Sequence, residues 1–463
     1  TPEDVRDVAA VVGKDLFTDE LRETLGQFEQ AKNFGSLIVP KLRDPAETLR
    51  VVEARDFGGD LLLKEVQARV VSVLRMAEAL SPKYHVVVAN PPYMGSKGMN
   101  DGLKSFLSDN YKAGKSDAMA AFIYRSQTLT FEKGVCAVIT LDSWMFLSSY
   151  NQLRADTLSK AKIASLLHIG WNCFPEGHTY NRGVAFVLGK SELNKAGEFF
   201  DLSDVPAVVD KHQLFKERKQ SRENLRFRNS DDFSALPEMP LAFAMSASLI
   251  RAFKDNPKFS DEFTVRQGLA TTDNGRFLRL WSEVSRSNVG FGYKSQGQTE
   301  SGCHQWFPYN KGGEFRKWYG NQTFLVNWQN DGVEIKEEIV RKYPYLNGNP
   351  NFVAKNQQYY FRESVSFSKV GSGLPSFRHY PEGFIFDVAG SSMFPESRGH
   401  IRQVVGFFNT RVAREILERL SPTLNIEIQQ INSFPMMVRE HWTSLESAID
   451  ALLALSKTDW DAY

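Results

Sequence analysis

The chain has 463 residues, of which 56 are Lys or Arg and 55 are Asp or Glu, so its formal net charge is +1. This length predicts two or three domains, each large enough to bury its own core. The near-neutral balance excludes a protein whose whole surface binds nucleic acid, so any such contact must come from local patches. Three widely spaced cysteines fit a reducing cytoplasm and lack the spacing of a disulfide framework or a metal site. No apolar stretch approaches the roughly 20 residues that span a bilayer, so we expect no membrane association.

Apolar runs at regular intervals predict most of the secondary structure in the first part of the chain. Residues 1–82 are charged and helical in pattern, and their last helix reaches about Leu80. A further helix is expected to begin at Ser116 and Asp117, which are favoured cap residues. The apolar runs expected to be strands are 84–89, 135–140, 163–169 and 184–188. This alternation indicates an α/β fold with a doubly wound, parallel sheet, of which residues 83–190 supply the distal half.

The expected buried strand at 84–89 ends abruptly in the tetrapeptide Asn90-Pro91-Pro92-Tyr93. Two prolines cannot continue a sheet, so the carboxyl edge of the strand presents an amide side chain and an aromatic ring. That edge is where open α/β sheets bind ligands. The tetrapeptide in this setting resembles the catalytic motif of amino-methyltransferases that use S-adenosylmethionine. The alternative is a turn that only ends the strand, with the tyrosine packed against a neighbour.

The residue types of this motif suit methyl transfer to the exocyclic amine of a base. Such an amine is a poor nucleophile because its lone pair is delocalised into the ring. The side-chain oxygen of Asn90 and the carbonyl of Pro91 would accept its N–H groups and localise the pair, while Tyr93 would stack on the base. Preorganised acceptors act strongly only in a dry pocket, which requires the base to leave the duplex.

Residues 191–236 interrupt the strand pattern and are expected to form a basic linker. From 211 to 228 there are seven Lys or Arg against two Glu. Such a run would track a nucleic-acid backbone with an affinity that falls as salt rises. A solvated basic helix is an equally good interpretation.

Residues 237–463 are expected to form a second domain that mixes helices and strands, including a helix over 401–420 and a strand over 424–428. A cluster at 306–319 alternates cations with aromatic rings and paired glycines, a composition that suits phosphates and bases. The alternative is a core hairpin whose cations lie along apolar surface. The side chains expected to contact DNA are Arg276, Arg279, Lys311, Arg316, Lys317 and Trp318.

Longer strings carry a more specific resemblance than the tetrapeptide does. They are the segments 80–95, 142–149, 266–271 and 306–319. Together they resemble the PglX family, the adenine-specific DNA methyltransferases of BREX phage-defence systems. The resemblance implies a base-flipping adenine-N6 methyltransferase that acts on double-stranded DNA, with Asn90 to Tyr93 as its catalytic motif, Phe174 facing the flipped base and residues 237–463 as the target-recognition domain. It also implies S-adenosylmethionine as the cofactor and other defence-system proteins as further partners.

The glycine-rich turn that would hold the cofactor is not found before the catalytic strand. Gly58 and Gly59 follow no apolar strand, so they are expected to join two helices. In a permuted order the turn would follow the motif, and the segment 384–391 is the candidate, although Ser391 stands where a second glycine is wanted. The simpler expectation is a fragment whose cofactor half lies upstream, with its cofactor-binding residues unidentified.

Two other functional classes remain open. The same tetrapeptide occurs in methyltransferases that modify a glutamine of a protein, but those enzymes lack a large domain after the catalytic one. A DNA-recognition module without activity of its own is the second class. Asp331, Glu334 and Lys336 faintly resemble a metal-dependent nuclease triad, but such spacings arise often by chance and we expect no metal site.

Overall fold

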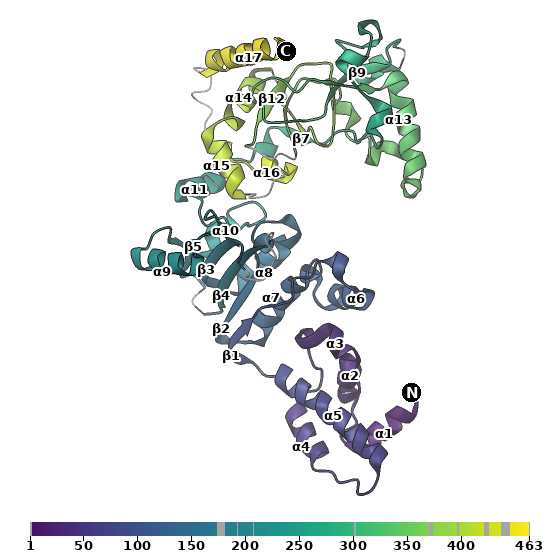
Figure 1. Cartoon of the computed structure of the whole chain (residues 1–463), viewed down its shortest axis with the longest axis vertical. Helices are drawn as coiled ribbons and strands as arrows, with labels where there is room; N and C mark the ends of the chain where they lie inside the picture. Colours follow the sequence, from purple (N-terminus) through teal and green to yellow (C-terminus); the bar gives the residue numbers. More distant parts are fainter. Residues whose placement is uncertain are drawn as a thin grey trace. The chain divides into compact units, whose positions relative to one another are not determined.

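The chain folds into two compact units, Thr1–Ala244 and Met245–Tyr463 (Figure 1). This computed structural model describes residues 2–173, 181–191, 193–206, 208–300, 302–369, 374–395, 398–420, 426–436 and 445–462. The sequence pattern predicts a division after residue 236, but Leu241 and Phe243 pack into the core of the first unit. Among these described residues, no helix is long and apolar enough to cross a membrane.

The first unit begins with helices that share a small core of their own. Their bounds are α1 (Pro2–Val12), α2 (Asp19–Gln27), α4 (Pro45–Glu53) and α5 (Leu61–Leu80). Side-chain caps fix where they start, because Thr18, Asp44 and Asp60 each accept a backbone N–H of the first turn of α2, α4 and α5 respectively. Their apolar faces then meet in a cluster that includes Leu21 and Leu74.

A buried arginine ties this helical segment to the rest of the unit. Arg125 lies in α7 (Ala118–Leu129), a helix that packs on the first two strands of the sheet, and its side chain is only 4% exposed. Its guanidinium donates hydrogen bonds to the carbonyls of Ser36, Ile38 and Leu80, at 2.8 to 2.9 Å. These bonds satisfy a buried charge with main-chain oxygens from two distant segments.

The first unit is built around a six-stranded mixed sheet with the order β1-β2-β4-β3-β5-β6. Its strands are β1 (Tyr84–Ala89), β2 (Thr130–Leu141), β3 (Lys162–Trp171), β4 (Arg182–Gly189), β5 (Gly197–Asp201) and β6 (Arg226–Arg228). The pairs β1 with β2 and β3 with β5 are parallel, whereas β4 is antiparallel to both of its neighbours. The sheet therefore continues into residues 191–236, where the pattern predicts only a linker, because β5 adds the buried Phe199 and Phe200 to it.

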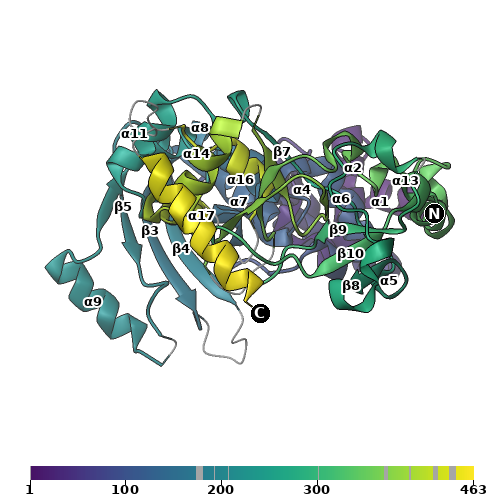
Figure 2. The same ribbon diagram turned by 90° about the horizontal axis from the view of Figure 1, so that it is seen from above.

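The two faces of this sheet are covered differently. Helix α7 and helix α8 (Asn151–Lys160) cover one face, while α9 (Lys211–Ser221) lies on the other side of the strands (Figure 2). The covered face buries apolar side chains such as Val138 and Phe186 completely or nearly so. The other face is largely open.

Strand β1 is largely exposed, which corrects the expectation of a buried strand. Val86 is 60% exposed and Val88 is 77% exposed. The reason is positional, since β1 pairs only with β2 among the described residues and its outer face carries no covering element.

The second unit contains two four-stranded sheets, with the orders β13-β9-β10-β8 and β12-β11-β14-β7. The first comprises β8 (Leu278–Leu280), β9 (Trp306–Asn310), β10 (Phe324–Asn327) and β13 (Ile385–Phe386). The second comprises β7 (Thr264–Arg266), β11 (Ser364–Phe367), β12 (Phe377–Tyr380) and β14 (Ser392–Phe394). The larger helices of this unit are α11 (Ala247–Asp255), α13 (Gln329–Lys342), α14 (Arg398–Phe408), α15 (Arg411–Leu420) and α17 (Glu446–Asp461).

Two predicted elements of the second unit differ in the structure. The single helix expected over 401–420 is two helices, because the Asn409 side chain bonds the backbone of Phe377 and Thr410 Oγ1 accepts the N–H of Ala413. The strand expected over 424–428 is not formed, since Ile428 begins the short helix α16 (Ile428–Asn432); residues 424 and 425 lie outside the described residues.

Candidate active site

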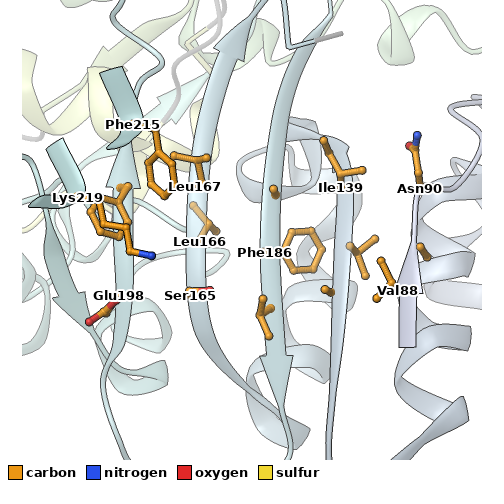
Figure 3. Close-up of a pocket in the computed structure, with 16 residues that line it drawn as sticks. Val88, Asn90, Ile139, Ser165, Leu166, Leu167, Phe186, Glu198, Phe215 and Lys219 are labelled. Carbon is orange, nitrogen blue, oxygen red and sulfur yellow. The ribbon is translucent and has the colours of Figure 1, made fainter. Parts of the chain in front are cut away.

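Asn90 follows β1 directly and stands at the carboxyl edge of the sheet, above the open face that carries Val88 and Ile139 (Figure 3). Its side chain is exposed, Pro91 is buried and Pro92 is exposed. The prolines end the strand because neither has an N–H to donate to a neighbouring strand, and the ring of each fixes φ. The structure thus places an amide oxygen at the rim of a cavity of about 450 Å³ along the open face.

Tyr93 turns back toward Asn90. Its hydroxyl donates to Asn90 Oδ1 at 2.8 Å and lies 3.3 Å from the carbonyl oxygen of Ile139, while its ring packs against the buried core of the sheet. Burial raises the pKa of Tyr93 to about 12, so the hydroxyl stays protonated and remains a donor at neutral pH. An amide oxygen has two lone pairs, so Asn90 Oδ1 can accept a second hydrogen bond in this arrangement.

Asp117 fixes the loop that follows the tetrapeptide. Its Oδ1 accepts the N–H of Met94 at 3.2 Å and the N–H of Met119 at 3.0 Å, so one carboxylate caps α7 and holds the loop. The N–H of Ala118 returns a bond to the carbonyl of Met94 at 3.0 Å. The cap was visible in the sequence, but its second role could not be read there because Met94 is far away along the chain.

Two residues weighed from the sequence lie on or beside a segment that is not described. Phe174, expected to face the base, lies outside the described residues. Cys173 is a packed thiol, since burial raises its pKa to about 11 and its Sγ lies 2.3 Å from where a Cβ at Gly183 would be. A thiol with a raised pKa is a weak nucleophile at neutral pH.

The cations expected to contact DNA all have partners inside the second unit. Arg276 pairs with Glu334 at 2.6 Å, and Arg279 donates to the carbonyls of Gly275 and Leu278. Lys311 pairs with the buried Asp387 at 2.6 Å.

The remaining three predicted contacts lie just beyond β9. Arg316 pairs with Asp459 at 2.8 Å, and Lys317 donates to the carbonyl of Asn409 at 2.9 Å. Trp318 has a positive φ of 72° and its backbone pairs with β12. These contacts come from segments far apart along the chain, so DNA would have to compete with them.

The other sequence candidates are accounted for by contacts within the second unit. In the segment 384–391, the Asp387 carboxylate accepts a hydrogen bond from Tyr309 Oη at 2.6 Å. A Cβ at Gly390 would lie 2.5 Å from the carbonyl oxygen of Asn310. This turn is therefore closely packed between strands. Of the nuclease-like residues, Glu334 pairs with an arginine and Asp331 pairs with Lys336.

The described residues do not form a complete site for S-adenosylmethionine. No glycine-rich turn follows a described strand and opens a helix, which is how such folds hold a nucleotide-like cofactor. They do place the Asn90 side chain at the rim of an open apolar face.

The chain is similar to known methyltransferases. Residues 28–174 match the model of the Eco57I restriction-modification methylase family. The chain is 32% identical to the adenine-specific methyltransferase PglX of Lacticaseibacillus casei (strain Zhang), over 97% of the chain and 38% of that relative. It is also 32% identical to the adenine-specific methyltransferase BrxX of Escherichia coli O9:H4 (strain HS), over 96% of the chain and 35% of that relative.

A solved structure shares the fold across both units. The Type IIL restriction-modification enzyme MmeI, determined in complex with DNA, matches 95% of this chain and 69% of its own with a TM-score of 0.52 at 13% identity. The chain spans little more than a third of the length of the two curated relatives. The resemblance to the PglX and BrxX adenine-specific methyltransferases is thereby confirmed for almost the whole of this chain.

Proposed function

We propose that the chain is the part of an adenine-N6 DNA methyltransferase that carries the catalytic motif and the DNA-recognition domain, within a phage-defence system of the BREX kind. The observation that carries the proposal is the position of Asn90. This exposed residue directly follows β1, at the carboxyl edge of the mixed sheet. The similarity to adenine-specific methyltransferases over nearly the whole chain supports it.

In this proposal the protein activates the amine by hydrogen bonding alone. Asn90 Oδ1 and the carbonyl of Pro91 accept the two N–H groups of a flipped adenine, which localises the lone pair on the nitrogen. The hydroxyl of Tyr93, already bonded to Oδ1, holds the amide in its orientation. Such preorganised dipoles stabilise the transition state by several kcal/mol, and the loss of a single group in a dry site costs roughly 2.7 to 4 kcal/mol.

We further propose that S-adenosylmethionine is held by a part of the longer protein outside this chain, which completes the sheet. Exposed valines on β1 and the open cavity beside them are apolar surface of the kind that a further strand and helix would cover. This accounts for a catalytic motif that has no cofactor turn beside it among the described residues. On this basis the isolated chain recognises DNA but transfers no methyl group.

The test is the substitution Asn90→Ala in the full-length protein. Transfer of labelled methyl from S-adenosylmethionine to DNA is expected to fall by at least about 100-fold, the size of effect seen when one preorganised group is lost. The affinity for DNA is expected to stay the same, because Asn90 contacts the amine of the base and not the phosphate backbone of the DNA.

The matched control is Asn110→Ala, another exposed asparagine, at the end of α6 (Asp101–Asn110). It is expected to leave methylation unchanged. Full activity of Asn90→Ala would remove the catalytic assignment, and mass spectrometry that finds methylglutamine in place of N6-methyladenine would replace DNA with a protein substrate.

A further inference from the structure

A set of charged side chains gathers at the same edge of the sheet as Asn90. Asp142 follows β2, His168 lies near the end of β3 and Asp201 ends β5, while Arg182 begins the antiparallel β4. The registers bring them together, since Leu141 pairs with Gly183, Trp171 with Arg182 and His168 with Asp201. The activation of the amine described above uses none of these residues.

Buried contacts fix one side of the Arg182 guanidinium. Asp142 Oδ2 is 2.9 Å from Arg182 Nε and 2.8 Å from His168 Nε2, and His168 Nδ1 is 3.6 Å from Asp201 Oδ1. His168 is 3% exposed and Asp142 is 8% exposed. His168 therefore holds the carboxylate of Asp142, and this carboxylate in turn orients the guanidinium of Arg182.

The other side of the guanidinium has unused donors. Arg182 Nε contacts Asp142 as an ion pair without hydrogen-bond geometry, and neither terminal amino group of Arg182 makes a hydrogen bond to a described residue. Its Cζ lies 5.6 Å from the centre of the Trp171 ring, and that indole is 42% exposed. A fixed fork of donors beside an exposed aromatic face is suited to a phosphodiester and an adjoining base.

The distance from the catalytic motif fits a neighbouring nucleotide. Ile139, whose carbonyl Tyr93 contacts, pairs with Ala185, three residues along β4 from Arg182. Two strand spacings across the sheet and three residues along it place Arg182 roughly 14 Å from Asn90. This backbone-to-backbone distance leaves room for a flipped nucleotide between the two residues.

We propose that Arg182 binds a backbone phosphate next to the nucleotide presented to Asn90, and that Trp171 supplies a flat surface for a neighbouring base. This inference rests on the proposed function and adds a contact in the first unit to the DNA interface expected in the second. The competing interpretation is a purely structural pair that packs the end of β3 against the start of β4.

The experiment measures binding of the chain to a short fluorescein-labelled duplex of mixed sequence by anisotropy over a series of salt concentrations. Arg182→Gln is expected to lower affinity and to reduce the slope of log K against log salt by about 0.9, the value for one phosphate contact in B-DNA. Arg182→Lys is expected to keep the slope, because it keeps the charge. Trp171→Ala is expected to lower affinity roughly tenfold with the slope unchanged, since stacking carries no charge.

The control is Arg75→Gln on α5, because Arg75 is also an arginine paired with a carboxylate, Glu53 at 2.8 Å. It is expected to change neither affinity nor slope. Melting temperatures of all variants separate loss of contact from loss of folding.

Three results would overturn the inference. Arg182→Gln with wild-type affinity and slope would remove the contact and leave the proposed function intact. Arg182→Lys that behaves like Arg182→Gln with the same drop in melting temperature would assign the pair a structural role. A wild-type chain that binds no duplex would remove the DNA recognition of the proposed function and this contact together.

Discussion

At the scale of single residues, the orientation of Asn90 is set by a neighbour three positions away. Tyr93 Oη donates to Asn90 Oδ1, which fixes the amide so that its oxygen rather than its NH₂ group is held at a defined place. The hydroxyl of Tyr93 therefore orients the amide of Asn90 within the motif. This role is separate from the one that the composition of the motif suggests for the aromatic ring. Removing the hydroxyl and keeping the ring separates the two roles.

Tyr93→Phe is expected to lower methylation by the full-length protein by less than Asn90→Ala does, and to cost about 0.5 to 1.5 kcal/mol of stability. Burial raises the pKa of Tyr93 from 10.0 to about 12. The stabilisation linked to this proton is therefore fully present below pH 10 and is lost as pH rises through about 12. Urea unfolding from pH 9 to 12 should show a steeper loss for the wild type than for the variant, and equal slopes would contradict the assignment.

Asp117 is expected to act through the shape of the loop after the motif. Asp117→Ala removes the acceptor for two N–H groups and should cost about 0.5 to 2 kcal/mol, the range for a lost helix cap. Asp117→Asn keeps an acceptor oxygen, and because burial raises the pKa of Asp117, a neutral side chain should be tolerated there. Urea unfolding of both variants checks this, and equal losses for Asn and Ala would exclude the cap.

At the scale of elements, β1 combines an apolar sequence with an exposed outer face. Its existence and its end were predictable, because an apolar run of strand length is broken there by two prolines, which cannot continue a sheet. The exposure of β1 was not predictable. An apolar composition indicates that a strand needs a covering element, but it does not say whether that element belongs to the same chain. The ends of β1, β3 and β4 lie within two residues of the prediction, whereas β2 begins at Thr130, five residues before the predicted start.

Val88→Lys is expected to change the stability of this chain by no more than about 0.5 kcal/mol, because the side chain is already 77% exposed. Leu166→Ala, on β3 and 1% exposed, is the contrasting variant and should cost about 2 to 5 kcal/mol. In the full-length protein Val88→Lys should instead reduce S-adenosylmethionine binding, measured by calorimetry. A large destabilisation of the isolated chain would show that the strand is covered within it.

The candidate site was only partly predictable for a related reason. Asn90 and Tyr93 lie within one tetrapeptide and could be found as a motif, whereas Arg182 and Trp171 meet through strand pairing and carry no local signal. The one available hint was that both flank the ends of predicted strands. The partners of the predicted DNA-contacting cations were equally hidden, because Arg316 and Asp459 are 143 residues apart.

At the scale of the whole molecule, each unit has a core of its own. Aromatic and aliphatic residues of the first sheet form one cluster, and those around β9 and α13 form another. Residues 245–463 are therefore expected to fold as a separate fragment with a cooperative thermal transition, since a core of this kind defines an independent domain. Circular dichroism of the fragment checks it, and a broad, gradual transition would contradict it.

DNA binding by this second unit can be tested through the ion pair that holds Arg316. Asp459→Asn should free Arg316 and raise affinity for duplex DNA, while Arg316→Gln should lower it and reduce the salt slope by about 0.9. Anisotropy titrations of the chain measure both. If the two variants shift binding in the same direction, or not at all, the arginine is a structural residue.

The way in which Arg125 binds three main-chain carbonyls bears on how related proteins could exchange parts. Main-chain oxygens are present whatever the side chains are, so this contact depends on the backbone path through Ser36, Ile38 and Leu80 and not on their identities. The helical segment before the sheet is therefore free to diverge in sequence while keeping its docking point. Chimeras that graft this segment from a relative should retain the join, provided that the recipient keeps an arginine at position 125.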